Sequence, residues 1–154
     1  MRRKDREVTD FSEIVAILKR AEVLRLAMHG GDYPYIVPLN FGFSAENRQV
    51  TFYVHCAPVG MKLDLLRADP RVAFELDGAH KLEYREKQQM CTYLFESVMG
   101  TGTAEFLEDP AEKRAALEAI LRQYHRDNVP INWDILPRTT CLKIAVNELT
   151  AKRH

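Results

Sequence analysis

The residue of this sequence with the clearest potential for chemistry is Lys62, in the first turn of a short predicted helix. The stretch from Val50 to Leu76 predicts a strand, a loop of small residues and then this helix, which Pro70 ends. Backbone N–H groups at a helix start are unpaired and carry partial positive charge, which suits a phosphate. A lysine there is slightly unfavourable for the helix dipole, and an anionic ligand would explain it. The alternative is a surface lysine beside an ordinary turn, because the loop lacks the glycines of a P-loop or a Rossmann fingerprint.

In the strand before this helix, alternate side chains are expected to point to opposite sides. One set points one way: Val50, Phe52, Val54 and Cys56. The other set points the opposite way: Thr51, Tyr53 and His55. His55 has a reference pKa near neutrality, which leaves ligand contact and proton transfer both open. Cys56 points to the same side of the strand as Val54, which indicates a buried, unreactive thiol.

A second stretch, from Pro34 to Phe43, has an unusual face. Large apolar residues occupy alternate positions and predict the core side of a strand: Tyr35, Val37, Leu39, Phe41 and Phe43. The positions between them include Pro38, Asn40 and Gly42, which weaken a sheet but leave its backbone bare. An edge strand at Pro38 and a bulge at Gly42 would be the simplest explanation.

Three helices are expected to position these residues. The first follows Asp10, with Glu13 in a capping-box position, and the second occupies Gly60 to Pro70. The third begins after Asp109, with Pro110 at its first helical position. Each helix carries apolar residues at helical spacing, so we expect each to pack one face against a sheet.

Six strands are expected to form that sheet. They are Val23 to His29, Tyr35 to Ser44, Gln49 to Cys56, Arg71 to Asp77, a long strand within Thr92 to Leu107, and Thr140 to Val146. Short links rich in turn formers make the first three consecutive antiparallel neighbours. The charged segment Gly78 to Met90 predicts an exposed excursion. Six strands with few helices favour a small closed or nearly closed barrel in a mainly β protein.

Composition narrows the class of protein. A chain of 154 residues is long enough for one domain with a proper core. Its 22 Lys and Arg balance 22 Asp and Glu, so no basic field exists to attract nucleic acid. No apolar run is long enough to cross a membrane, and no signal peptide follows Met1, which predicts a cytoplasmic protein. Three cysteines without a C-x-x-C pair argue against a disulfide framework and a structural zinc site.

Four segments, taken in order and spacing, carry a resemblance that spans Met1 to about Val146. They are MRRKDREVTDFSEIVAILKRAEVLRLAM, YPYIVPLNFGF, VHCAPVGMKLDLLRADPRVAFEL and SVMGTGTAEFLEDPAEKRAALEAIL. The sequence resembles the pyridoxamine 5′-phosphate oxidase-related flavoproteins, most of all the branch that includes the nitroimidazole-resistance proteins. The resemblance implies a six-stranded Greek-key split β-barrel with three flanking helices, forming a single FMN-binding domain over residues 1–154. It also implies a homodimer that holds FMN in two clefts between the protomers.

The resemblance further implies which residues hold FMN. Those along the isoalloxazine ring would be Pro38, Leu39 and Asn40. The missing bulk at Pro38 and Gly42 would make room for the ring, and the amide of Asn40 can hydrogen-bond its polar edge. Those along the ribityl chain and phosphate would be Tyr53, Val54, His55 and Cys56, with Lys62 paired to the phosphate. The partner chain would complete the cleft with Ser97, Val98, Met99 and Gly100.

Two features depart from or add to that pattern. Relatives often carry a second cation where Met61 stands, a loss that Arg67 or Arg71 could offset. Trp133, the single tryptophan, could either cap the flavin or pack in the core.

The implied function is that of an FMN-dependent oxidoreductase, with no side chain assigned as catalytic. Electrons would come from a reduced nicotinamide, NADH or NADPH, and pass to a small acceptor such as a nitroaromatic or a quinone. No Rossmann fingerprint is present, which fits one shared pocket that the two substrates occupy in turn. Two alternatives remain: a non-catalytic flavin- or haem-binding module of the same fold, and a structural dimer without a cofactor.

Overall fold

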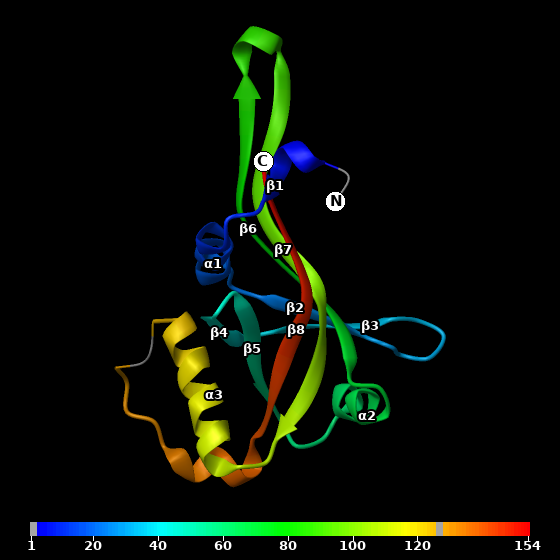
Figure 1. The fold of residues 1–154 in the computed structure, drawn as a ribbon, viewed down its shortest axis with the longest axis vertical. Helices are drawn as coiled ribbons and strands as arrows, with labels where there is room; N and C mark the ends of the chain where they lie inside the picture. The colour runs from blue at the N-terminus through cyan, green and yellow to red at the C-terminus, as the bar shows by residue number, and fades with distance from the viewer. Residues whose placement is uncertain (1–2, 126–127) are drawn as a thin grey trace.

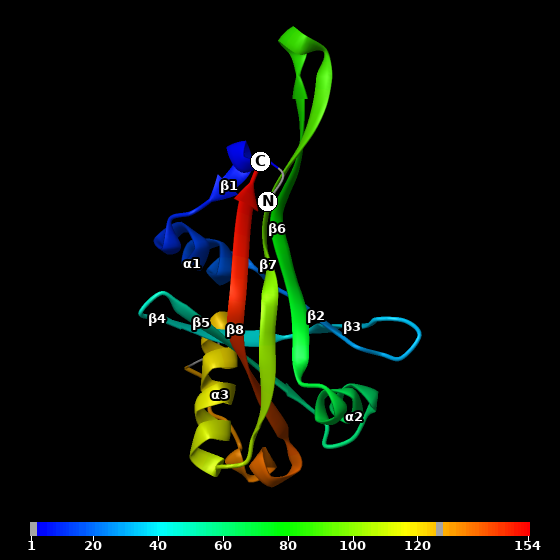
Figure 2. The ribbon, with the colours of Figure 1, turned by 45° about the vertical axis from the view of Figure 1, so that its right-hand side comes forward.

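The protein, described here by a computed structural model for residues 3–125 and 128–154, is built on one antiparallel sheet. Its strands are β1 (Glu7–Val8), β2 (Leu24–Met28), β3 (Tyr35–Leu39), β4 (Phe41–Glu46), β5 (Gln49–Cys56), β6 (Arg71–Arg85), β7 (Met90–Leu107) and β8 (Thr140–Arg153). They lie in the order β3-β2-β6-β7-β8-β5-β4, and β1 pairs with β8. Figures 1 and 2 show β6, β7 and β8 side by side along the length of the molecule.

The two outermost strands of this order are consecutive in the chain. Only Asn40 separates β3 from β4. The segment therefore pairs with β2 through β3 and with β5 through β4, at opposite ends of the strand order. This arrangement makes the sheet curl back on itself, and it confirms the expected antiparallel pairing of the first three predicted strands.

The strand count differs from the six expected, because the described residues form eight strands. The predicted strand Tyr35 to Ser44 is two strands that meet at Asn40, and the short strand β1 was not predicted. The segment Gly78 to Met90 is exposed, as predicted, but it is not a loop. It extends the β6–β7 ladder past an irregularity between Gly78 and Lys81 and turns through the 3-10 helix η2 (Glu86–Gln88). Figure 1 shows this extension projecting beyond the rest of the protein.

All three predicted helices are present: α1 (Phe11–Arg20), α2 (Met61–Ala68) and α3 (Pro110–Gln123). The Asp10 carboxylate caps α1 by accepting hydrogen bonds from the Ser12 and Glu13 amides, at 2.7 and 3.3 Å. The Asp109 carboxylate caps α3 by accepting from the Glu112 amide at 3.0 Å. Short 3-10 helices lie at η1 (Lys4–Arg6) and η3 (Trp133–Arg138). No helix in the described ranges has the length and apolarity needed to cross a bilayer.

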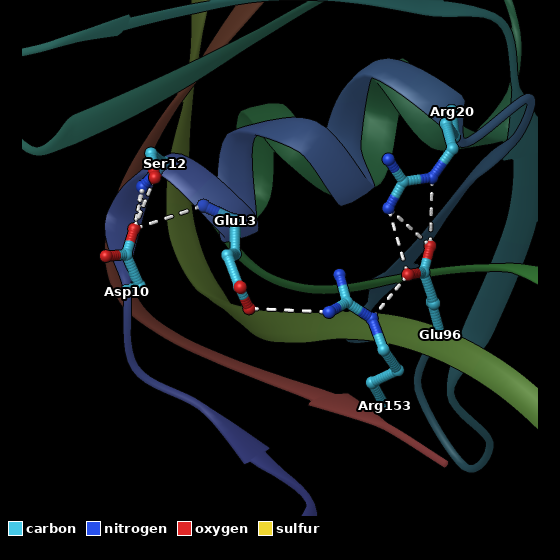
Figure 3. Close-up of polar contacts among 6 residues, drawn as sticks. All are labelled: Asp10, Ser12, Glu13, Arg20, Glu96 and Arg153. Carbon is cyan, nitrogen blue, oxygen red and sulfur yellow. Dashed lines mark hydrogen bonds and ion pairs between the residues drawn. The ribbon is translucent and has the colours of Figure 1, made fainter.

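A buried carboxylate fixes α1 to the sheet. Glu96 on β7 accepts hydrogen bonds from Arg20 at the end of α1 and from Arg153 at the end of β8, the shortest at 2.7 and 2.6 Å (Figure 3). Arg153 also reaches Glu13 at 3.4 Å. Burial alone would raise the pKa of Glu96, but the two arginines outweigh it and hold that pKa below its ordinary value.

The main core fills the curled sheet, and a second cluster lies under α3. The main core includes Leu24, Phe41, Phe52, Leu76 and Ile144. The second cluster contains Leu107, Ala116, Leu117, Ile120 and Cys141. Gly42 lies where α3 crosses the sheet, and a Cβ there would collide with the backbone of Ala119 and Ile120. The expectation that Gly42 makes room for a flat ligand is therefore wrong, because the helix occupies that space.

Candidate functional site

The side of the sheet that faces away from the core carries two rows of neighbouring residues. Each row follows direct cross-strand partners from strand to strand. The first row is Pro38, Arg25, Glu75, Met99 and Thr150. The second row is Ile36, Ala27, Ala73, Thr101 and Glu148. No described helix packs over these rows, so they form an open face, which we call the groove face.

The groove face is hollowed and mainly apolar. A groove of ≈ 580 Å³ runs over both rows, with Ile36, Met99 and Leu149 among its lining residues. Its floor is low because Ala27 and Ala73 occupy central strand positions that usually carry larger side chains. Ile36 on the outermost strand β3 and Met99 on the central strand β7 are 61% and 44% exposed, so this face presents large apolar side chains to water. Such a floor suits a flat apolar body.

Ser97 has the unsatisfied polar group of this face. The residue is only 5% exposed, and its Oγ is the one buried side-chain oxygen or nitrogen of the described residues without a hydrogen-bond partner. It lines a smaller pocket of ≈ 220 Å³ together with Asp77, His80, Phe95 and Lys152. An orphaned buried hydroxyl costs about 1–3 kcal/mol, so a group that covers this pocket and bonds Oγ would be stabilising.

A second group of predicted site residues lies where β5 leads into α2. Gly60 precedes α2 with φ 140°, a backbone conformation that suits glycine, and no side chain caps the helix. The N–H groups of the first turn are thus left without a side-chain partner. Lys62 is half-buried in this turn and makes no ion pair with any described residue. We call this region the β5–α2 corner.

Lys62 and the uncapped start of α2 place positive charge at the corner, whereas burial is the main cause of the pKa shifts of its neighbours. Partial burial, and then the charge of Lys62, lower the pKa of His55, so its ring is neutral at pH 7. Burial raises the pKa of the Cys56 thiol, although Lys62 acts in the opposite direction. Cys56 is half-buried, so it is less buried than expected, and its raised pKa keeps the thiol protonated near neutrality.

The two arginines that could offset the missing cation at Met61 are engaged elsewhere. Arg71 pairs with Asp69 at 2.7 Å. Arg67 pairs with Asp64 at 3.3 Å and lies 5.1 Å from the ring centroid of Phe106. Lys62 is left as the cation of the corner that no described acidic group neutralises.

Several other predicted site residues have side chains that cannot line a cleft. Leu39, Val54 and Val98 point into the main core at 9%, 1% and 0% exposure, so any ligand contact from them is limited to the backbone. Gly100 lacks a side chain because the Glu148 carbonyl and the Phe74 ring occupy that space. Tyr53 packs with the cluster under α3, and its hydroxyl lies 3.3 Å from Ser44 Oγ.

The remaining residues are distributed between the two regions. Pro38 is exposed in the first row of the groove face, and Asn40 is exposed at the junction of β3 and β4. Trp133 packs with the cluster under α3, and the Arg114 guanidinium lies 4.6 Å from its ring centroid. Of the two alternatives for Trp133, this position corresponds to packing in the core.

One chain does not bring the two regions to a common ligand. His55 on β5 pairs with Cys141 on β8, and Cys141 pairs in turn with Leu107 on β7. Met99 lies eight residues from Leu107 along β7. At about 3.4 Å per residue this separation is about 27 Å along β7. A second protomer would be needed to join Ser97 and Met99 to the β5–α2 corner.

Sequence reasoning missed the residues that shape the groove floor. Ala27, Ala73 and Thr101 are distant in sequence and come together only through the register of β2, β6 and β7. The available signal was the small size of both alanines within strands of large residues. That signal is weak without knowledge of which strands are neighbours.

Comparison with known proteins identifies the family. A profile of the family described as "Pyridoxamine 5'-phosphate oxidase" matches residues 10–153, which is nearly the whole chain. The chain belongs to this family, as its resemblance indicated. No curated protein matches the chain.

Solved structures of similar proteins agree with this assignment. A candidate 5-nitroimidazole antibiotic resistance protein from Bacteroides thetaiotaomicron is 30% identical, with TM-score 0.83 over 96% of this chain and 86% of that one. A FAD-binding protein from Mesorhizobium loti is 22% identical, with TM-score 0.67 over 97% of each chain. The flavocytochrome Anf3 of Azotobacter vinelandii is 18% identical, with TM-score 0.77 over 100% of this chain and 72% of that one. The last two similarities show a shared fold.

Proposed function

We propose that the protein is an FMN-dependent oxidoreductase that works as a homodimer, with its cofactor held between the protomers. One observation carries the proposal: Ser97 Oγ is buried without a hydrogen-bond partner among the described residues, and it lines a small pocket that adjoins the groove face at Glu75 and Met99. A bound molecule or a second chain seated there can supply the missing hydrogen bond. The flavoproteins among the similar structures support a flavin as that molecule.

The residues of the chain fit the parts of an FMN molecule. The apolar floor at Ala27 and Ala73 is shaped for a flat ring. Lys62 and the uncapped start of α2 suit a phosphate, because both present positive charge to the same space. Asn40 offers amide donors and an acceptor to the polar edge of a ring.

In the proposed dimer each cofactor contacts both chains. One chain would contribute Pro38, Leu39, Asn40, Tyr53, Val54, His55, Cys56 and Lys62, with Leu39 and Val54 acting through their backbone. The other would contribute Ser97, Val98, Met99 and Gly100. The separation of about 27 Å along β7 between the level of His55 and Met99 supports assigning His55 and Met99 of one cleft to different chains.

When bound, the flavin supplies reversible electron transfer from a reduced nicotinamide to a small oxidised acceptor such as a nitroaromatic or a quinone. The side chains of the protein bind and orient. Lys62 balances the phosphate charge, and neutral His55 can hydrogen-bond without adding charge to the corner. Burial raises the pKa of the Cys56 thiol, so it stays protonated and is a poor nucleophile near neutrality.

A spectroscopic experiment tests this function. The purified protein should show the two visible bands of a flavin and release FMN on acid treatment. Under anaerobic conditions NADH or NADPH should bleach these bands, and a nitroaromatic should restore them. A colourless protein that does not take up FMN would contradict the proposal.

Other outcomes would identify the alternatives within the same fold. Released FAD would correct the cofactor, and a Soret band would indicate a haem-binding module. Bound FMN that neither nicotinamide reduces would indicate a flavin carrier without turnover.

A further inference from the structure

The extended end of the β6–β7 ladder has no packing partner of its own. We call residues 81–94 the arm, which is the part with η2 at its tip (green, top of Figure 1). The strands on either side end before the arm begins. The pairing of β8 with β7 stops at Glu96 with Arg153, and β2 pairs with β6 only at residues 73–75. The arm is therefore a ribbon of two strands, an arrangement that is at best marginally stable in water.

One side of the arm is apolar. Leu82 is opposite Tyr93, and Tyr84 is opposite Cys91, so all four point to the same side. Leu82, Tyr84 and Tyr93 are 66%, 58% and 54% exposed, and Cys91 is exposed as well. Packing this side against another body would bury three large side chains that now contact water.

The other side of the arm is more polar. Lys81, Glu83 and Arg85 lie there opposite Leu94, Thr92 and Met90, and Arg85 pairs with Glu83 at 3.5 Å. At its base, Thr92 Oγ1 lies 3.3 Å from a ring nitrogen of the C-terminal His154. The two sides thus differ in composition. On the apolar side Tyr93 stacks on His80, with 5.7 Å between the ring centroids, whereas Leu82, Tyr84 and Cys91 stay exposed.

The apolar side continues into the groove face. Alternate residues of β7 point to one side, and this row runs from Cys91 and Tyr93 through Phe95 and Ser97 to Met99. Tyr93 and Phe95 line the same small pocket as Ser97. A body that covers the groove face and bonds Ser97 therefore meets the base of the arm.

We propose that the arm is a dimerisation element whose apolar side, Leu82, Tyr84, Cys91 and Tyr93, packs against a second copy of this chain. The inference rests on the proposed homodimer and extends its interface beyond the cofactor. In a two-fold dimer the same patch is used by both protomers, so the two arms would make equivalent contacts.

The size of the face supports a second copy as the occupant. Twelve residues line the groove, and the small pocket adds six others. A stable interface takes about 20–30 residues from each side, so the groove and pocket alone fall short. The apolar residues of the arm bring the face into that range.

The charges of the face also permit self-association. Arg25 is already paired with Glu75 and Asp77 at 3.0 and 2.6 Å. The whole chain has 22 basic and 22 acidic residues. Two copies can therefore approach without the repulsion that a face of one sign would cause.

The native Cys91 provides the test, with Cys141, buried in the cluster under α3, as the reference in the same chain. The dissociation constant of the dimer is first measured by sedimentation equilibrium. The rate at which iodoacetamide labels each cysteine is then measured by peptide mass spectrometry, at protein concentrations below and above that dissociation constant. We expect labelling of Cys91 to slow by at least about tenfold as the dimer forms, while Cys141 keeps its low rate because its own chain already buries it.

Two matched double variants complete the test. Leu82→Glu with Tyr84→Glu places charges on the apolar side, and we expect it to raise the dimer dissociation constant by at least about thirtyfold. Lys81→Glu with Arg85→Glu changes charges on the other side and should alter it by less than about threefold. Both pairs are exposed, and a thermal melt checks that each variant is folded.

The outcomes separate this inference from the function on which it rests. The role of the arm is wrong, and the proposed function is untouched, if the dimer forms but the labelling rate of Cys91 does not depend on concentration. The same holds if the dimer tolerates the changes at Leu82 and Tyr84. A chain that is monomeric at every concentration overturns both the arm and the proposed cleft. A colourless dimer with protected Cys91 supports the arm and contradicts the flavin.

Discussion

Replacing Lys62 by Met removes one positive charge beside the uncapped start of α2 and retains most of the side-chain length. If the corner holds a phosphate, this change should weaken the binding of a flavin that carries one. Riboflavin has the same ring system without the phosphate, so it serves as the matched ligand. The comparison isolates the charge of Lys62 from any general damage to the cleft.

The size of the effect follows from the exposure of Lys62. Unit charges about 4 Å apart interact by about 4 kcal/mol at an effective dielectric of about 20. Lys62 is half-buried, so water and salt reduce this value. Exposed ion pairs contribute up to about 1 kcal/mol and hydrogen bonds to charged groups about 1.5–3 kcal/mol, and we take about 1.5 kcal/mol as the expected loss. That loss is roughly a tenfold rise in the dissociation constant of FMN.

The assay is titration of the cofactor-free protein with FMN and with riboflavin, followed by flavin fluorescence. Riboflavin affinity should change by less than about twofold, because no phosphate contact is lost. Lys62→Arg keeps the charge and should bind FMN nearly as the parent does. Lys19→Met removes an exposed lysine from α1 and should change neither affinity.

The same variant has a readout that needs no flavin. Lys62 is the second cause, after partial burial, of the lowered pKa of His55. In Lys62→Met the pKa of His55 should rise but remain below its ordinary value, because the burial persists. NMR of the His55 ring measures this pKa. An equal loss of FMN and riboflavin affinity, or unchanged FMN affinity while the pKa of His55 rises, would refute the phosphate assignment.

Three further substitutions test other parts of the structure. Ser97→Ala removes an unsatisfied buried hydroxyl, so the cofactor-free monomer should be as stable as the parent or up to about 1 kcal/mol more stable. The same change should weaken FMN binding about fivefold. Equal FMN affinities of the parent and the variant would exclude a hydrogen bond to Oγ. Gly42→Ala should lower stability by about 1–3 kcal/mol through its collision with α3, seen as a lower midpoint in urea, and an unchanged midpoint would contradict that packing. Glu96→Gln should lower stability by about 1–3 kcal/mol above about pH 5. Because the folded pKa of Glu96 is lowered, the contribution of its carboxylate is present above the unfolded pKa of about 4.3 and is lost as pH falls through the folded pKa. Urea titrations at several pH values should therefore show the two proteins converging in acid, and a difference independent of pH would contradict this role.

The helices were predictable because their signals are local. The Asp10 and Asp109 caps act on amides two or three residues away, so they can be read from the sequence. The corner containing His55 and Lys62 was predictable for the same reason, since only six residues of one strand, loop and helix separate the two positions.

Non-local pairing accounts for what sequence reasoning missed. The charged segment from Gly78 to Met90 shows little alternation, yet most of it is strand because β6 and β7 supply each other's hydrogen bonds. Gly42 illustrates the same limit at the level of one residue. A small residue on a strand indicates close approach, but it does not say whether a ligand or a helix approaches.

Sedimentation velocity of the purified protein, monitored at both the protein and the flavin absorbance, tests the central claim most directly. The proposed function predicts that FMN absorbance moves with a species of twice the 17.8 kDa chain mass, with one FMN per chain. A colourless species of 17.8 kDa, in the presence of added FMN that stays behind as free ligand, would contradict a cofactor held between two protomers.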